Sequence, residues 1–306
     1  MNRIRHSYAG HLRLMQLSST DLFVFVEGKQ SDPYFYARIC ASIPDLHVRY
    51  EICTARQLPG ATGGKQALLS FFSFLRQCRA LVSSLEGQAT TSIFILDKDV
   101  DDLQHKKKRS QHVVYTEYYD VQNYIFMYGN LLTGAASAAS VDPARLRAEL
   151  SDAPRWCLRI VRLWREWISL CLCVLEENIS CEVNYKVLSR VQTRPCGPTD
   201  ARRYATLTHD VARRCGLPVA VFRQRLAATT RKVDKYFARG QHHRIFKGKW
   251  FATVLADDVD RIMAGRPYDS SRLASRLTSS VAATLDFTEP WADHFRNPIR
   301  NVTGML

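Results

Sequence analysis

Carboxylates stand at the ends of two apolar stretches, and these residues are the ones whose types and spacing could do chemistry. Glu27 closes the run Leu22–Val26, while Asp97 and Asp99 close the run Ser92–Leu96. Three carboxylates a few ångströms apart repel one another, so they need a positive charge close by. Mg²⁺ meets this need, because it prefers oxygen ligands and keeps several of its waters. The pattern predicts a site for Mg²⁺ or Mn²⁺ formed by Glu27, Asp97 and Asp99.

The two apolar runs predict the strands that must position these acids. Each run is short, continuous and rich in β-branched and aromatic residues, and each is stopped by polar or glycine residues. Neither run alternates between apolar and polar residues, which is typical of a parallel sheet covered on both faces. Ligands bind at the carboxyl edge of such sheets. We therefore expect Glu27, Asp97 and Asp99 to meet in one crevice at that edge.

The chemistry that this site predicts is metal-assisted hydrolysis of a phosphodiester bond. Metal ions held by carboxylates stabilise the attacking and leaving oxygens of an in-line reaction. Glu27 is either a metal ligand or the base that deprotonates water, and both roles stay open. Lys247 and Lys249 are candidates to stabilise negative charge on the phosphoryl group. The adjacent His242 and His243 are weaker metal-ligand candidates, because neighbouring side chains diverge in direction.

Three ordered elements resemble the TOPRIM domain of topoisomerases, primases and OLD-type nucleases. They are Glu27-Gly28, Asp97-x-Asp99 and the stretch Tyr119–Tyr124. That stretch is similar to a "Tyr/His-Asp-Ile-Glu-Asn-Tyr" segment in a family of stand-alone TOPRIM-like proteins, which includes the AriB toxins of PARIS anti-phage systems. Gln122 stands where many relatives have Glu, so Asp120 is the carboxylate that remains a metal-ligand candidate there. The resemblance covers roughly the first 130 residues.

The resemblance implies both a fold and a function. The expected fold is α/β: a TOPRIM-like, Rossmann-like, mostly parallel sheet flanked by helices over residues 1–132, then a mainly helical domain over 133–306 that binds nucleic acid or a partner. The implied function is that of a Mg²⁺-dependent nuclease, the toxic effector of an abortive-infection system. The implied substrate is tRNA, and the implied partner is an ABC-type, AriA-like ATPase that restrains the toxin. Self-association into a homo-oligomer is compatible with this expectation.

Two alternatives share the same residues. An OLD-like enzyme that nicks DNA would use every one of the carboxylates. A catalytically silent TOPRIM module would instead serve as the binding partner of an ATPase.

The charge of the chain favours a polyanionic partner. Among 306 residues, 43 Lys and Arg face 29 Asp and Glu, for a net charge of +14. Such an excess favours contacts with phosphates and the release of their counterions. A basic loop follows the acidic edge directly and is predicted to grip a phosphate backbone; its residues are Lys106, Lys107, Lys108 and Arg109.

The glycine-rich turn Gly60–Gly64 is a second place where phosphate contacts are conceivable. It departs from a P-loop, because Pro59 replaces the first glycine and Gln66 replaces the Ser or Thr that would contact Mg²⁺. We interpret it as the entry to a helix whose backbone N–H groups can still hold a phosphate. Lys65 is expected to face the carboxylate crevice.

Other features predict a cytoplasmic protein with no membrane association. The N-terminal stretch has no apolar core of a secretory signal, and the longest apolar run, Trp167–Leu175, is far too short to span a bilayer. The 9 cysteines form no Cys-x-x-Cys pair, and their odd number argues against a closed set of disulfides. Free thiols in a reducing compartment are expected.

Alternating strand and helix patterns predict a parallel sheet with right-handed crossovers. Ser31 and Asp32 are N-cap candidates for a helix that runs to about Ala41. Small residues over 133–143 predict a linker, and the tryptophans that follow predict core anchors. The tail from Trp291 carries no pattern that predicts an element. The other expected elements are a strand over Val48–Cys53, a helix over Lys65–Leu85 and a strand over His112–Thr116.

Overall fold

The chain folds into two compact units in a computed structural model that describes residues 7–44, 46–59, 64–104, 106–179, 181, 183, 185 and 188–304. The sheet unit comprises the residues up to 98 together with 107–117 and 286 onward. The helical unit comprises 99–106 and 118–285. The chain therefore passes between the units several times, in contrast to the predicted single boundary between residues 132 and 133.

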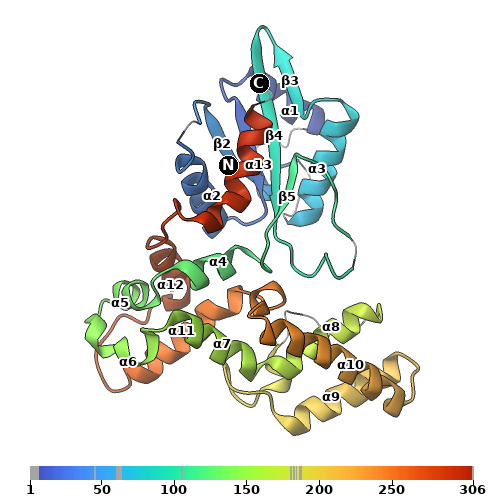
Figure 1. The fold of residues 1–306 in the computed structure, drawn as a ribbon, viewed down its shortest axis with the longest axis vertical. Helices are drawn as coiled ribbons and strands as arrows, with labels where there is room; N and C mark the ends of the chain where they lie inside the picture. Colours follow the sequence, from blue (N-terminus) through green and yellow to red (C-terminus); the bar gives the residue numbers. More distant parts are fainter. Residues whose placement is uncertain are drawn as a thin grey trace. The chain divides into compact units, whose positions relative to one another are not determined.

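A mostly parallel sheet forms the centre of the sheet unit, as predicted (Figure 1). β1 pairs in parallel with β2 and with β4, and β5 pairs in parallel with the last residues of β4. β3 pairs with the first residues of β4 and is antiparallel. The strands are β1 (Leu22–Val26), β2 (Tyr50–Thr54), β3 (Val82–Leu85), β4 (Gln88–Leu96) and β5 (Val113–Tyr115).

The β3–β4 hairpin corrects the helix predicted over Lys65–Leu85. The helix α3 runs only from Lys65 to Gln77. Arg79 then adopts a left-handed conformation with φ 54°, which a helix cannot continue through. The turn at Glu86-Gly87 has φ values of 52° and 82°, the signs required by a type I′ two-residue hairpin. The apolar spacing of α3 hid this change of backbone direction.

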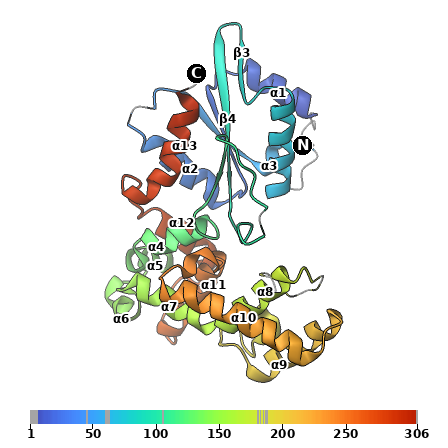
Figure 2. The ribbon, with the colours of Figure 1, turned by 45° about the vertical axis from the view of Figure 1, so that its right-hand side comes forward.

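Helices cover both faces of the sheet (Figure 2). α2 (Ser31–Ala41) and α13 (Asp293–Thr303) lie on one face, while α1 (Tyr8–Leu17) and α3 lie on the other. Phe25 and Phe94 are partners in the β1–β4 register, and their rings stack with centroids 4.8 Å apart. All five residues of β1 are buried. Burial on both faces explains why the strand sequence does not alternate.

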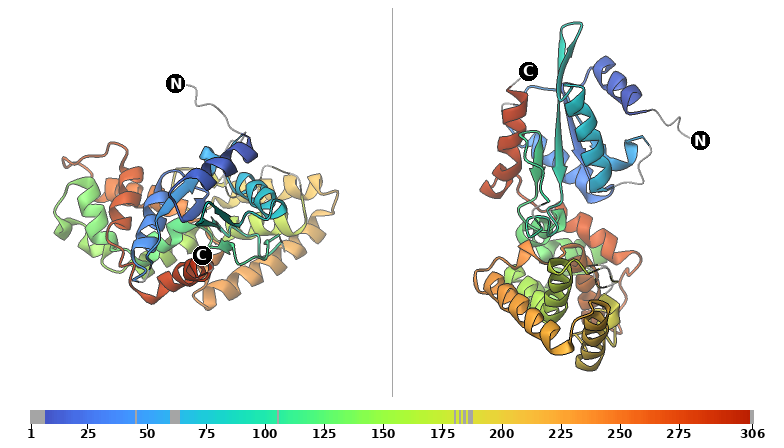
Figure 3. Two further views of the ribbon diagram at one scale, coloured as in Figure 1. Left: turned by 90° about the horizontal axis from the view of Figure 1, so that it is seen from above. Right: turned by 90° about the vertical axis from the view of Figure 1, so that its right-hand side faces the viewer.

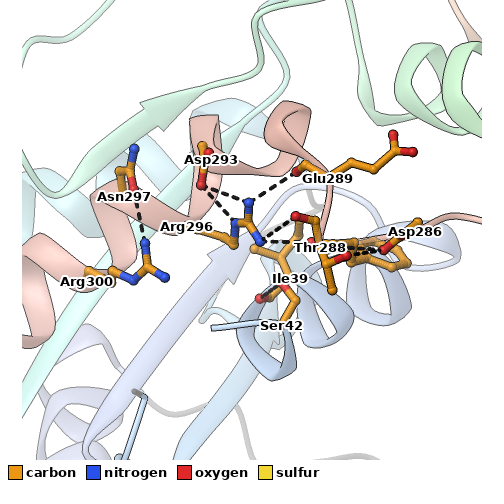
Figure 4. Close-up of polar contacts among 10 residues, drawn as sticks. Ile39, Ser42, Asp286, Thr288, Glu289, Asp293, Arg296, Asn297 and Arg300 are labelled. Carbon is orange, nitrogen blue, oxygen red and sulfur yellow. Dashed lines mark hydrogen bonds and ion pairs between the residues drawn. The ribbon is translucent and has the colours of Figure 1, made fainter. Parts of the chain in front are cut away.

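The C-terminal tail completes the sheet unit, although its sequence predicted no element. Phe295, on α13, is fully buried and packs against Phe35 and Tyr36 at centroid distances of 5.8 and 5.5 Å. The Arg296 guanidinium donates hydrogen bonds to the carbonyls of residues 287, 288 and 289 (Figure 4). Its Nε also donates to Asp293 Oδ1 at 3.0 Å. Phe295, Ile299 and Val302 are spaced as one face of a helix, and this spacing is the signal for α13 in the sequence.

The helical unit confirms the predicted helical character of the later chain (Figure 3). The three tryptophans at 156, 164 and 167 are buried core residues, as predicted. Its helices are α4 (Val121–Tyr128), α5 (Leu131–Ala139), α6 (Arg147–Leu150), α7 (Ala153–Leu163), α8 (Arg165–Glu176), α9 (Ala201–Arg214), α10 (Val219–Ala238), α11 (Lys249–Ile262) and α12 (Leu273–Ala282).

The segment 133–143, predicted to be a linker, is largely helix α5. Its glycine and alanines are buried, whereas Thr133, Ser137 and Ser140 are exposed. A Cβ atom on Gly134 would lie 2.5 Å from Val281 Cγ2, so the helix could not approach α12 as closely with a larger residue. Small residues here serve close helix packing, which composition alone does not distinguish from a linker.

Two further observations bear on the expectations for membrane-spanning helices and for the cysteines. Among the residues that the structure describes, no helix combines the length and apolar character needed to cross a membrane. All nine cysteines are free, and five of them are buried: Cys40, Cys53, Cys157, Cys171 and Cys173.

Replacing the buried ring on α13 tests whether the tail is part of the core. Phe295→Ala should lower the free energy of unfolding by about 3–5 kcal/mol, because it removes a large buried side chain and leaves a cavity. The measurement is denaturant unfolding followed by circular dichroism. Asn297→Ala, at an exposed position of the same helix, should change stability by less than about 0.5 kcal/mol. Equal stability of both variants would show that α13 does not pack on the sheet.

Candidate functional site

The carboxyl ends of β1 and β4 bring Glu27 and Asp97 together. The parallel register pairs Val26 with Ile95, so the residues that follow leave the sheet at the same edge. The Asp97 backbone N–H donates a hydrogen bond to Glu27 Oε1 at 2.8 Å. Asp97 itself is buried, with 7% of its surface exposed. The Glu27 carboxylate therefore binds the backbone of Asp97 at this edge of the sheet.

Asp32 fixes the turn that presents Glu27. Its Oδ2 accepts a hydrogen bond from the Gly28 N–H at 2.7 Å, and Ser31 Oγ donates to its Oδ1 at 3.2 Å. A Cβ atom on Gly28 would lie 2.4 Å from Asp32 Oδ1, so only glycine fits beside this buried carboxylate. The N-cap prediction for Ser31 and Asp32 is wrong: the helix begins at Ser31 after an N-cap at Gln30, and Asp32 binds the preceding turn instead.

Lys98 is a buried residue of this edge that sequence reasoning passed over. Its backbone N–H donates to Thr116 Oγ1 at 2.7 Å, and the Thr116 N–H donates to the Leu96 carbonyl at 2.9 Å. Only 3% of Lys98 is exposed. Lysine is almost never buried to this extent without a charged or polar partner. A lysine between two aspartates is recognisable in the sequence. Lys98 offers positive charge beside Asp97.

Asp99, Asp120 and Lys249 form a second charged cluster, within the helical unit. The Asp99 N–H donates to the Tyr119 carbonyl at 2.8 Å, and Asp99 has a left-handed φ of 50°. Aspartate tolerates this conformation better than most residues. Burial raises the pKa of Asp120 to about 6; the Lys249 ammonium opposes that rise, and the Asp99 carboxylate adds to it. Asp99 and Lys249 therefore lie within electrostatic reach of Asp120.

Asp120 acts as a cap for two helices. It is the N-cap of α4, and its Oδ1 accepts from the Asn123 N–H at 3.3 Å and from Asn123 Nδ2 at 3.1 Å. Its Oδ2 accepts from the Lys249 N–H, in the first turn of α11, at 3.4 Å. With 1% of its surface exposed and both oxygens accepting hydrogen bonds, this carboxylate fits a capping role better than the predicted metal-ligand role.

Asn123 holds the segment that carries the two candidate lysines. Its Nδ2 donates to the Phe246 carbonyl at 3.0 Å, and its Oδ1 lies 3.3 Å from His243 Nδ1. The Tyr119 N–H donates to the His243 carbonyl at 2.9 Å. The stretches 119–123 and 243–249 are therefore one hydrogen-bonded structure. Sequence reasoning missed Asn123, although it lies in the stretch Tyr119–Tyr124 that carries the resemblance.

The two adjacent histidines are buried, with ring centroids 4.1 Å apart. Burial lowers the pKa of His242 to about 4 and that of His243 to about 3, and the neighbouring Arg162 and His242 contribute respectively. Both rings are therefore neutral at pH 7. Their burial and their place in the hydrogen-bonded segment make them structural residues.

The candidate lysines differ in their surroundings. Lys247 is half-buried, and its Nζ donates to the Tyr185 carbonyl at 3.3 Å. Lys249 has an exposed side chain that acts electrostatically on Asp120. Lys65 is the first residue of α3 and half-buried, whereas residues 60–63 of the glycine-rich turn lie outside the described residues.

The basic loop is exposed, as a phosphate-binding loop must be. Lys106 belongs to the helical unit, while Lys107, Lys108 and Arg109 belong to the sheet unit. The Lys107 ammonium lies 5.1 Å from the centroid of the Tyr115 ring, and the Lys108 N–H donates to Tyr115 Oη at 2.9 Å. These contacts tie the backbone of the loop to β5 and leave its charges at the surface.

The donor set fits a small magnesium site rather than an all-protein cage. Within the ranges that the structure describes, no three His, Cys, Asp or Glu side chains are grouped as a metal-binding set. The predicted trio is divided, because Glu27 and Asp97 belong to the sheet unit and Asp99 to the helical unit. Mg²⁺ commonly takes one or two carboxylates and completes its shell with water and substrate phosphate. Glu27 and Asp97, two carboxylates at one edge, match this requirement.

No model of a known protein family matches the chain, and no curated protein matches it. The resemblance to TOPRIM proteins therefore depends on the motif residues alone.

Substitution of Gly28 tests the turn that presents Glu27. Gly28→Ala should lower the free energy of unfolding by about 1–3 kcal/mol, because the new methyl group overlaps the buried Asp32 carboxylate and breaks its hydrogen bond. Chemical denaturation measures this. Gly304→Ala is the control, since its Cβ would meet only the Arg300 carbonyl oxygen at an ordinary 3.4 Å and the Asn301 carbonyl oxygen at 3.8 Å. In the double variant with Asp32→Ala, the two losses should be less than additive; additive losses would contradict the overlap.

The buried histidines predict a loss of stability in acid. The folded pKa of His242 lies below the value of an unfolded histidine, so the unfolded chain takes up protons first. Stability is therefore complete above pH 6.5 and falls as pH decreases toward about 4. His242→Leu should reduce the slope of the free energy of unfolding by about 1.4 kcal/mol per pH unit in this window. Denaturation at several pH values measures it, with His209→Leu on the exposed surface of α9 as control. Parallel profiles of His242→Leu and the unmodified protein would contradict the assignment.

Proposed function

We propose that the protein is a metal-dependent nuclease whose reacting centre is built on Glu27 and Asp97. The observation that carries this proposal is the hydrogen bond from the Asp97 N–H to Glu27 Oε1, which ties the Glu27 carboxylate to the end of β4 at the carboxyl edge of a parallel sheet. That edge is the usual ligand-binding position in open α/β sheets. Asp99 follows only two residues later, so chain geometry keeps its Cα within about 7 Å of the Asp97 Cα.

In the proposed reaction, each residue has a limited task. Glu27 and Asp97 would hold Mg²⁺ or Mn²⁺, a bound divalent ion that would stabilise charge on the attacking and leaving oxygens. The Asp97 N–H orients the Glu27 carboxylate, which serves as a ligand or accepts the proton of the attacking water. Asp120 caps α11 by accepting a hydrogen bond from the Lys249 N–H, and Lys249 remains the predicted phosphate-binding lysine of the helical unit.

The proposed substrate is nucleic acid. The net charge of +14 and the exposed loop Lys106–Arg109 support it, because phosphate contacts supply most of the affinity of such complexes. The resemblance adds tRNA as the favoured substrate, an anti-phage role in the cytoplasm and an ATPase partner that restrains the toxin. DNA nicking and a silent, partner-binding module remain the alternatives that the following experiment separates.

Glu27→Gln should lower the cleavage rate at least about a hundredfold, because the substitution keeps the shape of the side chain and removes its charge and basicity. Purified protein is incubated with tRNA and with supercoiled plasmid in parallel, with Mg²⁺ or with EDTA. Glu51→Gln, an exposed carboxylate of β2, is the matched control and should cleave normally.

The two substrates and the variants separate the alternatives. Mg²⁺-dependent cleavage of tRNA that Glu27→Gln abolishes supports the proposal, whereas nicking of plasmid alone supports the OLD-like alternative. If the protein cleaves neither substrate, the nuclease proposal fails in favour of the binding module. If Glu27→Gln cleaves as fast as the unmodified protein, the assignment of the reacting centre to Glu27 is wrong.

A further inference from the structure

The helical unit contains a pocket of about 480 Å³ that no motif had indicated. This volume lies within the range of small-molecule binding sites. One wall is the C-terminal half of α10, and the others come from α8, from the turn at Asp102-Leu103 and from residues 241–244. The lining side chains used below are those of Leu103, Leu172, Lys235, Tyr236, Arg239 and Arg244.

Positive charge exceeds negative charge in this pocket. Four cations line it, at residues 232, 235, 239 and 244, against two acids, Asp102 and Glu176. Glu176 is already engaged by Lys232 at 2.9 Å and by Thr229 Oγ1 at 2.9 Å. Lys235 and Arg239 are exposed and, among the residues described, their side chains make no hydrogen bond or ion pair. They lie four residues apart, Lys235 in the last turn of α10 and Arg239 at its C-cap, a spacing that puts side chains on the same side of a helix.

The pocket also has an aromatic and apolar side. Tyr236 is half-buried and lies between Lys235 and Arg239 in the sequence. Leu103 and Leu172 provide further apolar surface. Burial, followed by the charge of Asp102, raises the pKa of Tyr236, so its hydroxyl stays a neutral hydrogen-bond donor. A tyrosine ring next to unpaired cations is the combination with which proteins stack a base and bind its phosphate.

Two of the segments that line the pocket lie close in the chain to residues of the second charged cluster. Asp102 and Leu103 follow Asp99 in one short turn, in which the Leu103 N–H donates to the Val100 carbonyl at 3.0 Å. Gln241 and Arg244 flank the histidine pair, which the Tyr119 N–H binds through the His243 carbonyl. Lys249 follows Arg244 by five residues.

We propose that this pocket binds one unstacked nucleotide of a single-stranded RNA segment, with its phosphate on Lys235 and Arg239 and its base on Tyr236. This inference rests on the proposed function, because it assigns a subsite for the same substrate. The pocket would select substrates with an accessible single-stranded stretch, such as a loop or an end, over continuous duplex.

Binding of a fluorescein-labelled, single-stranded RNA oligonucleotide, followed by fluorescence anisotropy in EDTA, tests the subsite without any metal-dependent cleavage. Lys235→Ala combined with Arg239→Ala should weaken binding about tenfold or more and reduce the slope of log affinity against log salt by about 0.7, the value for one phosphate of a single strand. Arg223→Ala combined with Arg231→Ala removes the same charge from exposed positions of the same helix, outside the pocket, and should weaken binding much less. Tyr236→Leu should weaken binding by about five- to tenfold through loss of stacking.

Competition with AMP identifies the form of nucleotide that the pocket accepts. Displacement of the labelled RNA by AMP supports a site that also takes free nucleotides, and failure of AMP with success of an unlabelled oligonucleotide supports a site for a strand. Equal weakening by the pocket pair and by the control pair would overturn the subsite, since the charges would then act as a general field. Absence of binding by the unmodified protein would overturn it too.

The failure of the subsite and the failure of the nuclease proposal give different results. Glu51→Gln should bind the labelled RNA as the unmodified protein does, because this exposed carboxylate of β2 belongs neither to the pocket nor to the proposed reacting centre. If cleavage proceeds normally in the pocket variant and its affinity is unchanged, the nuclease proposal stands and the subsite is wrong. If the pocket variant loses affinity while the unmodified protein cleaves nothing, the subsite stands as a binding site and the nuclease proposal is wrong.

Discussion

The hydrogen bond between the Asp97 N–H and Glu27 Oε1 is the interaction on which the candidate site at the sheet edge depends. It forms only because β1 and β4 run in parallel, in a register that ends both strands at the same edge. Helices on both faces bury that register, and the Asp32 carboxylate fixes the turn after Glu27. The Glu27 carboxylate thereby accepts a backbone hydrogen bond beside the buried Lys98, which brings positive charge to this edge.

The helical unit also contains a buried carboxylate, which hydrogen bonds and a nearby cation stabilise. Asp120 is buried there, and it is kept ionised above about pH 6 by N–H donors and by the nearby Lys249. Asn123 extends this structure to the segment that contains the two histidines. The hydrogen bonds of Asp120 and Asn123 link the first turn of α4 to the segment that leads into α11, so they favour one arrangement of these two helices. The motif 119–124 is therefore as much a structural element as a chemical one.

Local patterns predicted the strands well, and they failed where a change of direction depends on single residues. The runs at Leu22–Val26 and Ser92–Leu96 were recognisable because burial on both faces leaves continuous apolar sequence. The hairpin before β4 was not recognisable, because Arg79 and Glu86 adopt left-handed conformations that residues of their type rarely take. The small residues of α5 looked like a linker, although they serve close packing against α12. At the tail, three apolar residues at helical spacing carried a signal that is clear only once Phe35 and Tyr36 are seen beside them.

The sequence by itself determined the excess of positive charge, the free cysteines, the parallel character of the sheet and the placing of Glu27 and Asp97 at strand ends, since each follows from residue type and short-range order. Only the tertiary structure decided that Asp120 caps two helices, that the histidines are buried and neutral, and that Lys235, Tyr236 and Arg239 share a pocket with a turn that follows Asp99. The physical reason is the same in each case. Burial and hydrogen bonding join residues more than a hundred positions apart, and these long-range contacts leave no periodicity in the chain.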